Sequence, residues 1–181
     1  MFTYCVDGVC HGLIIAHVDD FLFGGDKLFH VYIISKIRKM FVISLEESSD
    51  MKYLGLNVSE NETGILLTMD QYVESINPVL VNDCSDKNAS LSKPDYTSFR
   101  HVIGQINCCA TQVRLNASFM NCQLSNSSSK PTLNDLLTAN KVVRSLKSAD
   151  VGIQFSCLEG DMLWLIAFTD ASYANLPTGG S

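Results

Sequence analysis

The first 70 residues alternate short apolar runs with turn-forming residues, a pattern typical of antiparallel strands. β-forming residues fill Phe2–Val6 and Val9–Val18, and the Asp-Gly dipeptide between them favours a two-residue hairpin turn. The apolar run resumes as Phe21–Phe23 before two glycines. We therefore predict a second hairpin, with Asp19 and Asp20 at its tip.

A helix is predicted next. Asp26 is placed to cap a helix over Lys27–Met40, because apolar residues recur there at helical spacing. The expected buried stripe of this helix is Phe29, Ile33, Ile37 and Met40. A short strand and an acidic loop then lead to a second strand at Tyr53–Val58, followed by a turn and a returning strand at 65–69. Asp70 is expected to cap a helix over Gln71–Asn77.

The hydrophobic period then changes from that of strands to that of helices. We predict helices over Asp95–Gln112 and about Ala117–Leu124, with a third over Leu133–Lys147. The first has an apolar face formed by Phe99, Val102, Ile103, Ile106 and Ala110. The third begins with an N-terminal capping arrangement of Thr132 and Asp135. Its apolar face is Leu133, Leu136, Leu137, Val143 and Leu146.

Two strands are predicted to close the sequence. They cover Gly152–Phe155 and Met162–Thr169, and the second delivers Asp170 at its end. Together these strands and helices predict an α+β fold.

Composition limits the function classes. The 181 residues are 46% hydrophobic and 18% charged, which is ordinary for a globular protein with one sizeable core or two small domains. The net charge of −6 argues against a protein that coats nucleic acid by bulk electrostatics, although a local groove remains open. The basic residues near 36–39 and 141–147 are expected to lie on solvated helix faces.

Cysteine usage indicates a reducing compartment. The seven cysteines are an odd number without any C-x-x-C spacing, so we expect core thiols. Neither a signal peptide nor a membrane-length apolar run is present, which predicts an intracellular protein of the cytoplasm or nucleus that is not secreted and has no membrane partner. A zinc site from Cys5, Cys10, His11 and His17 is an alternative, but its spacing fits no common ligand pattern.

The paired acids in "LIIAHVDDFLFGGD" need an explanation, because a buried carboxylate without a partner is strongly destabilising. At a hairpin tip, both carboxylates can reach a shared ligand without entering the sheet. Carboxylate oxygens are the ligands that Mg²⁺ prefers, and phosphoryl transfer uses divalent ions that hold the attacking and leaving oxygens. Alone, Asp19 and Asp20 are weak evidence for metal binding, since adjacent acids occur in many loops.

Five ordered segments resemble the reverse transcriptases of copia-type retrotransposons. "HVDDFLFGG" resembles their "YVDD" box and the strand after it, and "MKYLGLNVSENETGILLTMDQYV" is similar to the "LG" primer-grip strand with its following hairpin and helix. "YTSFRHVIGQINCCATQVR" resembles "YR.LIG.L.YLA..TRPD", and "ANKVVRSLKSADVGIQF" resembles "A.KRVLRYLKGT.D.GL.F". "AFTDASYA" resembles "GYSDADWA", which opens the attached RNase H domain. The resemblance spans nearly the whole sequence but covers only part of such a polyprotein.

The resemblance implies a domain organisation within the α+β class. Residues 1–70 would be the C-terminal half of a reverse-transcriptase palm, made of antiparallel hairpins and a helix and including a primer-grip-like hairpin. Residues 71–150 would be thumb- or connection-like helices, and residues 151–181 the truncated first strands of an RNase H-like domain.

It also implies roles for individual residues. Asp19 and Asp20 match the catalytic metal ligands of the polymerase, with Asp19 the more direct ligand. Leu54 and Gly55 match the strand that steadies the primer end, where a glycine allows close approach of nucleic-acid backbone. Asp170 matches the first metal carboxylate of RNase H. From the residues alone, Leu54 and Gly55 are also explained as a core residue and a residue that interrupts a strand. Asp170 is also explained as an acid at the end of a strand or as a helix cap.

The implied cofactor is Mg²⁺ or Mn²⁺, and the implied partners of the intact enzyme are an RNA or DNA template-primer, deoxynucleotides and the missing parts of the polyprotein. The family's third polymerase carboxylate lies on an earlier strand, upstream of Met1, and its remaining RNase H carboxylates follow Ser181. We therefore expect weak or absent metal binding and no autonomous polymerisation by this chain. His17 stands where the family has Tyr, and Leu115 and Asn116 replace its Pro and Asp.

A second function class stays open. The chain is alternatively a decayed or co-opted fragment that acts as a non-catalytic module binding nucleic acid or protein. The helices Asp95–Gln112 and Leu133–Lys147 would then supply the contact surface, and the net charge predicts weak binding to nucleic acid.

Overall fold

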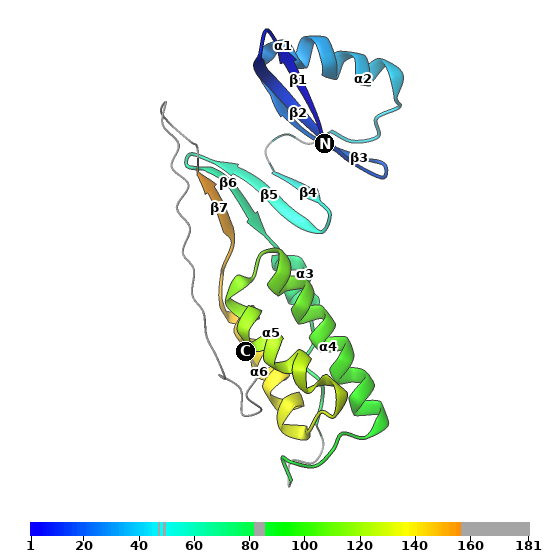
Figure 1. The fold of residues 1–181 in the computed structure, drawn as a ribbon, viewed down its shortest axis with the longest axis vertical. Helices are drawn as coiled ribbons and strands as arrows, with labels where there is room; N and C mark the ends of the chain where they lie inside the picture. Colours follow the sequence, from blue (N-terminus) through cyan, green and yellow to red (C-terminus); the bar gives the residue numbers. More distant parts are fainter. Residues whose placement is uncertain (47, 49, 82–85, 157–181) are drawn as a thin grey trace.

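The N-terminal residues form a three-stranded antiparallel sheet. In the structure, a computed structural model that describes residues 1–46, 48, 50–81 and 86–156, β1 (Phe2–Val6), β2 (Val9–His17) and β3 (Asp20–Gly25) lie in sequence order (Figure 1). Asp7 and Gly8 make the first turn with positive φ angles of 50° and 82°, as their dipeptide predicts. Both predicted hairpins are confirmed, although the turn of the second is Val18–Asp19, one residue earlier than predicted, and Asp20 is the first residue of β3.

One continuous helix covers one face of this sheet. It consists of α1 (Lys27–Phe29), the π-helical η1 (His30–Ile34) and α2 (Ser35–Met40). Asp26 caps it as predicted, since its Oδ1 accepts from the Phe29 N–H at 3.0 Å. The predicted burial of Met40 is wrong, because Met40 is 74% exposed. The wider π turn shifts the helical phase, so Ile34 rather than Met40 enters the core with Phe29.

A second antiparallel sheet follows and has the order β4-β5-β6-β7. Its strands are β4 (Asp50–Tyr53), β5 (Leu56–Asn61), β6 (Gly64–Thr68) and β7 (Ile153–Ser156). The predicted strand over Tyr53–Val58 is wrong at its start, because Leu54 and Gly55 form a turn with φ angles of 52° and 81°. The sequence does not indicate this turn, because Leu54 belongs to an apolar run and leucine rarely adopts a positive φ.

β7 returns from the far end of the sequence to pair with β6, with Ile153 opposite Leu67. The predicted strand Gly152–Phe155 is therefore present, shifted by one residue. It belongs to the same sheet as residues 50–68, whereas the expected domain division separates the two at residue 151. The predicted strand Met162–Thr169 and Asp170 lie outside the described residues.

The remaining elements form a helical body. They are α3 (Asp70–Ser75), α4 (Lys93–Gln112), the short 3₁₀ turn η2 (Leu115–Ala117), α5 (Ser118–Asn126), a second 3₁₀ turn η3 (Ser127–Ser129) and α6 (Leu133–Ser148). The capping box of Thr132 and Asp135 is confirmed at the start of α6. Asp70 is the first residue of α3 rather than its cap, so this predicted cap is wrong. The helix α4 begins two residues before the predicted Asp95 and is capped by Ser92.

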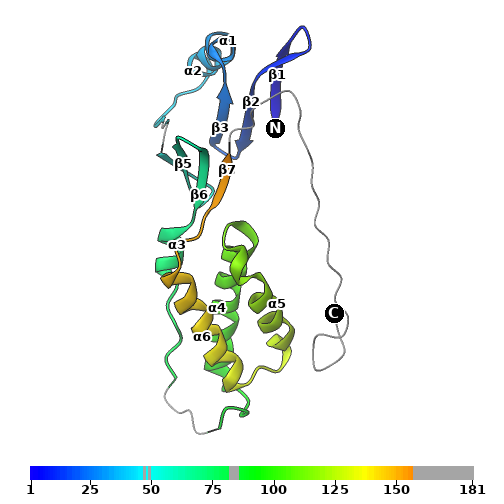
Figure 2. The same ribbon diagram turned by 90° about the vertical axis from the view of Figure 1, so that its left-hand side faces the viewer.

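The predicted α+β class is confirmed at the level of two antiparallel sheets and several helices. The elements follow one long axis: the N-terminal sheet and its helix at one end, the four-stranded sheet in the middle, and the helical body at the other end (Figures 1 and 2). The larger core lies among α3 to α6 and includes Phe99, Ile106, Leu136 and Leu146, all fully buried. A smaller core surrounds Phe29 beneath the first sheet. None of the described helices is long and apolar enough to cross a membrane.

Candidate functional site

Asp19 and Asp20 lie at the tip of the β2–β3 hairpin. His17 pairs with Asp20, so Val18 and Asp19 form a two-residue turn and Asp20 opens β3. Val18 has a φ of 52° and is 85% exposed. Positive φ is unfavourable for a β-branched residue, and such strain recurs at functional sites. The backbone therefore holds both acids at an exposed and strained tip.

Both carboxylates are accessible. Asp19 and Asp20 are exposed, and neither side chain makes a hydrogen bond or an ion pair with another described residue. Other acids in the same part of the chain are engaged: Asp26 contacts His11, and Glu46 contacts Arg38. The oxygen atoms at the tip are thus available for an external cation.

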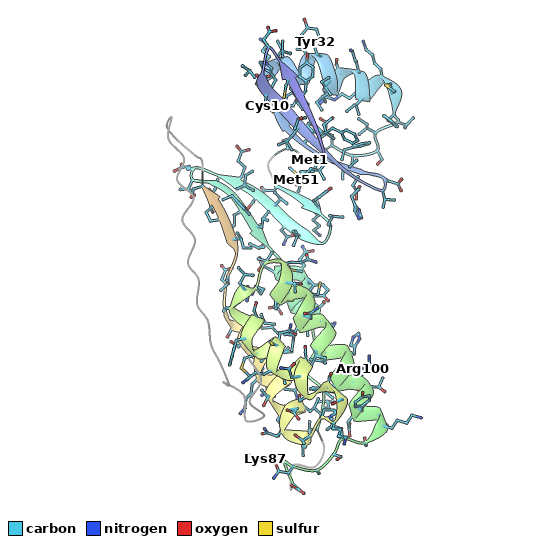
Figure 3. All side chains as sticks on the ribbon, viewed as in Figure 1. Met1, Cys10, Tyr32, Met51, Lys87 and Arg100 are labelled. Atoms are coloured by element: carbon cyan, nitrogen blue, oxygen red, sulfur yellow. The ribbon has the colours of Figure 1, made fainter. Side chains whose placement is uncertain are left out.

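A groove of about 560 Å³ begins at this tip. Its floor includes side chains of β3, η1 and α2, namely Phe21, Phe23, Ile34 and Ile37. The residues after α2, from Phe41 to Glu46, form one wall, and Met51–Tyr53 of β4 form the other. Met51 carries a label in Figure 3, where it lies at the side of β4 toward the N-terminal sheet. The groove thus combines an apolar floor with two acids at one end.

One ion pair fixes the wall formed by residues 41–46. Arg38 Nε donates to Glu46 Oε2 at 3.1 Å, and Arg38 Nη2 donates to Oε1 of the same carboxylate. The hydrogen bonds from Arg38 lower the pKa of Glu46, and the bonds to Glu46 raise the pKa of Arg38. This two-pronged contact ties the segment to α2 and occupies the only cation that α2 contributes to the groove lining.

The β4 wall contributes polar groups of its own. Lys52 Nζ donates to Gln71 Oε1 at 2.6 Å, which links β4 to α3. The Tyr53 hydroxyl is buried and has no hydrogen-bond partner among the described residues. A buried hydroxyl without a partner is uncommon, and Tyr53 is also one of the residues that line the groove.

The structure brings together only some of the predicted site residues. Asp19 and Asp20 share the tip, whereas Leu54 and Gly55 lie at the turn beyond the β4 wall. Asp170 lies outside the described residues. In the part of the chain that is described, no group of three or more His, Cys, Asp or Glu side chains is arranged to hold a metal ion.

The alternative zinc ligands are not gathered into a site among the described residues. His11 Nδ1 lies 2.7 Å from Asp26 Oδ2, and the Cys10 thiol donates to the Gly12 carbonyl at 3.6 Å. Both side chains are thus engaged in contacts within the N-terminal sheet and its helix. The zinc hypothesis has no support from this geometry.

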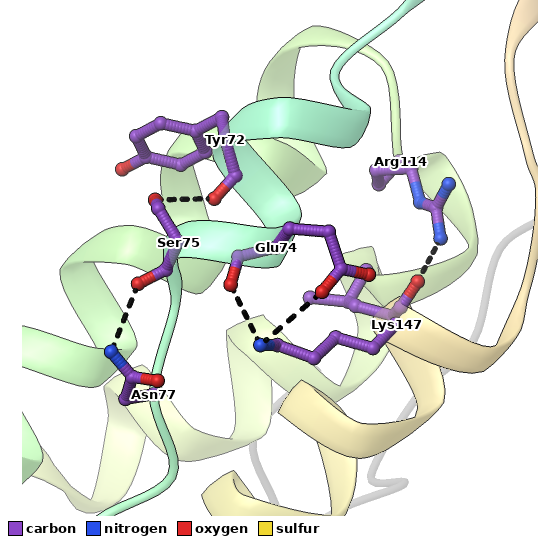
Figure 4. Close-up of polar contacts among 7 residues, drawn as sticks. Tyr72, Glu74, Ser75, Asn77, Arg114 and Lys147 are labelled. Atoms are coloured by element: carbon purple, nitrogen blue, oxygen red, sulfur yellow. Dashed lines mark hydrogen bonds and ion pairs between the residues drawn. The ribbon is translucent and has the colours of Figure 1, made fainter.

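Sequence reasoning missed the groove wall and the role of Arg114. The run at residues 41–45 is apolar but exposed, with Val42 fully so, and no sequence signal separates it from a buried strand. Arg114 is 1% exposed and donates to the Val151 carbonyl at 3.0 Å and to the carbonyls of Leu146 and Ala149. Figure 4 shows one hydrogen bond from the Arg114 guanidinium to a carbonyl oxygen. Arg114 thus acts as a buried cap on the carbonyls at the C-terminal end of α6. Its signal in the sequence is a single Arg within an apolar segment.

The sign of the net charge differs between the two halves of the described chain. Acidic residues outnumber basic ones in residues 1–81, and basic residues outnumber acidic ones in residues 86–156. The helical body is thus the more basic part despite the overall charge. Comparison with protein-family models, curated proteins and solved structures gives no match to this chain.

Proposed function

We propose that the chain is part of a copia-type reverse transcriptase, with Asp19 and Asp20 as metal ligands for nucleotidyl transfer by the intact protein. The observation that supports this best is the pair of exposed carboxylates without partners at a strained hairpin tip. Strand, Asp-Asp turn and strand present two hard oxygen donors from one rigid element. The five resembling sequence segments supply the reaction class.

The tip fits a hydrated divalent ion. Mg²⁺ keeps several waters and is usually bound by one or two carboxylates together with substrate phosphates, so Asp19 and Asp20 would supply the protein ligands of a weak site in this chain. When bound, the ion supplies charge stabilisation for the transferred phosphoryl group. Asp19 and Asp20 would hold it at the exposed hairpin tip, at one end of the groove.

The other parts take roles around this tip. Leu54 and Gly55 form an exposed turn that we assign to contact with the primer backbone, since a glycine allows a close approach. The basic majority of the helical body favours contact with template-primer phosphates. Asp170 is assigned to an RNase H-like metal site.

Binding of Mn²⁺ tests the metal proposal directly. Water-proton relaxation of Mn²⁺ with the 181-residue chain should show a weak site that Asp19→Asn and Asp20→Asn each weaken by at least about tenfold, since each removes a charged ligand. Asp7→Asn is the matched control, because Asp7 is also an exposed acid in a two-residue hairpin turn. Equal Mn²⁺ affinity of all four proteins would overturn the proposal. Primed RNA template with nucleotides and Mg²⁺ should give no extension by this chain.

A non-catalytic module is the second candidate. One observation favours it: two carboxylates stand without a third metal ligand among the described residues. The coding DNA upstream of Met1 and downstream of Ser181 separates the two functions. An open frame with the missing acids supports a piece of an active enzyme, whereas stops or frameshifts support a relic or co-opted protein.

A further inference from the structure

The groove lies between two sheet edges. β3 is the outermost strand of the first sheet and β4 the outermost strand of the second, within the described residues. Both strands line the groove, whereas β1 and β2 do not. The unpaired sides of two sheets thus border one apolar surface.

The outward backbone groups of β3 follow from its turn. His17 and Asp20 flank a two-residue turn, so they form a hydrogen-bonded pair of the antiparallel ladder. Such pairs alternate, so Leu22 bonds to β2 while the N–H and C=O groups of Phe21 and Phe23 point away from it. No backbone hydrogen bond from another described segment reaches these outward groups.

This edge lacks the usual protection. In natural proteins, Lys, Pro or a bulge in an edge strand hinders pairing with another chain. The β3 sequence, Asp-Phe-Leu-Phe-Gly-Gly, contains neither Lys nor Pro. Its pairing with β2 is regular over all six residues. An extended chain can therefore align with β3 without obstruction by the strand itself.

Apolar side chains make up much of the groove lining, with Asp19 and Asp20 at one end and Arg38, Ser44, Glu46 and Lys52 among its other polar groups. The ring centroids of Phe21 and Phe41 lie 5.8 Å apart in a tilted contact, and both side chains remain about half exposed, at 42% and 51%. Asp19 and Asp20 stand at the tip, while Arg38 is already bonded to Glu46. A ligand with apolar side chains and one cation at this end would match both features.

We propose that this groove binds an extended segment of a partner protein, which adds to β3 as a further strand. An added strand satisfies outward backbone groups that a helix, whose own groups are already bonded, would leave unpaired. The segment has apolar residues at alternate positions facing Phe21 and Phe23, and a Lys or Arg beside Asp19 and Asp20. This inference rests on the free edge and the groove and not on nucleotidyl transfer, and the cation of the segment would take the place of a metal ion at Asp19 and Asp20.

A synthetic peptide provides the test. Fluorescence anisotropy with the 181-residue chain in EDTA would use a fluorescein-labelled peptide of sequence Lys-Thr-Val-Thr-Val-Thr-Val-Lys. A second peptide carries N-methyl groups at alternate residues, on the edge that would face β3. Because N-methylation removes the donors but keeps the charge and side chains, it should weaken binding by at least about tenfold.

Protein variants separate backbone pairing from general attraction. Phe21→Pro removes an outward N–H, and since Phe21 and Ala16 are not a hydrogen-bonded pair, the bonds to β2 remain. Phe21→Ala is the matched control, which loses the same ring but keeps the N–H. The proline variant should bind about fivefold more weakly than the alanine variant.

Three results would overturn the proposal: equal binding of the two peptides, no saturable binding, or occupation of the edge by a second copy of the chain, seen as a dimer by light scattering. Circular dichroism checks the fold of each variant. If the proline variant does not fold, the comparison of the two peptides with the unaltered chain still decides the outcome.

Discussion

His11 and Asp26 join the second strand to the start of the N-terminal helix, with His11 Nδ1 2.7 Å from Asp26 Oδ2. The other carboxylate oxygen of Asp26 accepts from the Phe29 N–H and caps the helix. One side chain thus links the sheet to the helix whose Phe29 ring fills the smaller core.

Acid should weaken this part of the fold. The hydrogen bond from His11, followed by that from the Phe29 N–H, lowers the pKa of Asp26 below its ordinary 3.8. A lowered folded-state pKa stabilises the fold above pH 3.8, and this contribution disappears as the pH falls from 3.8 through the folded value. Urea unfolding followed by circular dichroism should show a smaller acid-induced loss for Asp26→Asn than for the unaltered chain, because Asn caps a helix but does not ionise. Asp7→Asn is the control, and an equal acid-induced loss in both variants would contradict the expectation.

The buried cap at Arg114 should be the most sensitive single position of the helical body. Arg114→Met leaves the carbonyls of Leu146, Ala149 and Val151 without this donor, and we expect a loss of about 3 kcal/mol in the free energy of unfolding. Arg100→Met is the control, since Arg100 is exposed on α4 and should change stability by less than about 0.5 kcal/mol. Similar urea midpoints for the two variants would show that the cap contributes little.

The hydrogen bonds of Arg114 could not be predicted from the sequence, whereas several local features could. Hairpins, the helical stretches and the capping box of Thr132 and Asp135 follow from local periodicity and turn chemistry, which act within a few residues. The bonds from Arg114 to the end of α6 join residues more than thirty positions apart, so no local pattern encodes them. The pairing of β7 with β6 has the same origin in long-range packing.

One part of the candidate site could also be predicted from the sequence, and another part could not. The hairpin tip at Asp19 and Asp20 was predictable, because strand formers, an acidic pair and glycines are adjacent in sequence. The groove beside it was not, since residues 41–46 and β4 reach it only through the tertiary fold. The turn at Leu54 and Gly55 was missed because a positive φ at leucine contradicts ordinary turn preferences.

The capping box at α6 gives a prediction of moderate size. Thr132→Ala removes the hydroxyl that accepts from the Asp135 N–H, and it should lower the free energy of unfolding by about 1 kcal/mol. Thr138→Ala, within the same helix, is the control and should change stability by less than about 0.5 kcal/mol, because alanine is the better helix former. Equal effects at the two threonines, measured by urea unfolding, would mean that the cap is not specific.

Two glycines of the N-terminal sheet should respond oppositely to the same substitution. A Cβ at Gly12 would overlap the ring of Phe29, which is 1% exposed and has no room to move, whereas a Cβ at Gly24 would meet no atom within 4 Å. We therefore expect Gly12→Ala to cost about 1–3 kcal/mol through overpacking of the smaller core. Gly24→Ala should be neutral or stabilising by up to about 1 kcal/mol, since alanine restricts the unfolded chain. Urea unfolding followed by circular dichroism measures both, and a Gly12→Ala protein as stable as Gly24→Ala would show that Phe29 does not pack against β2 as described.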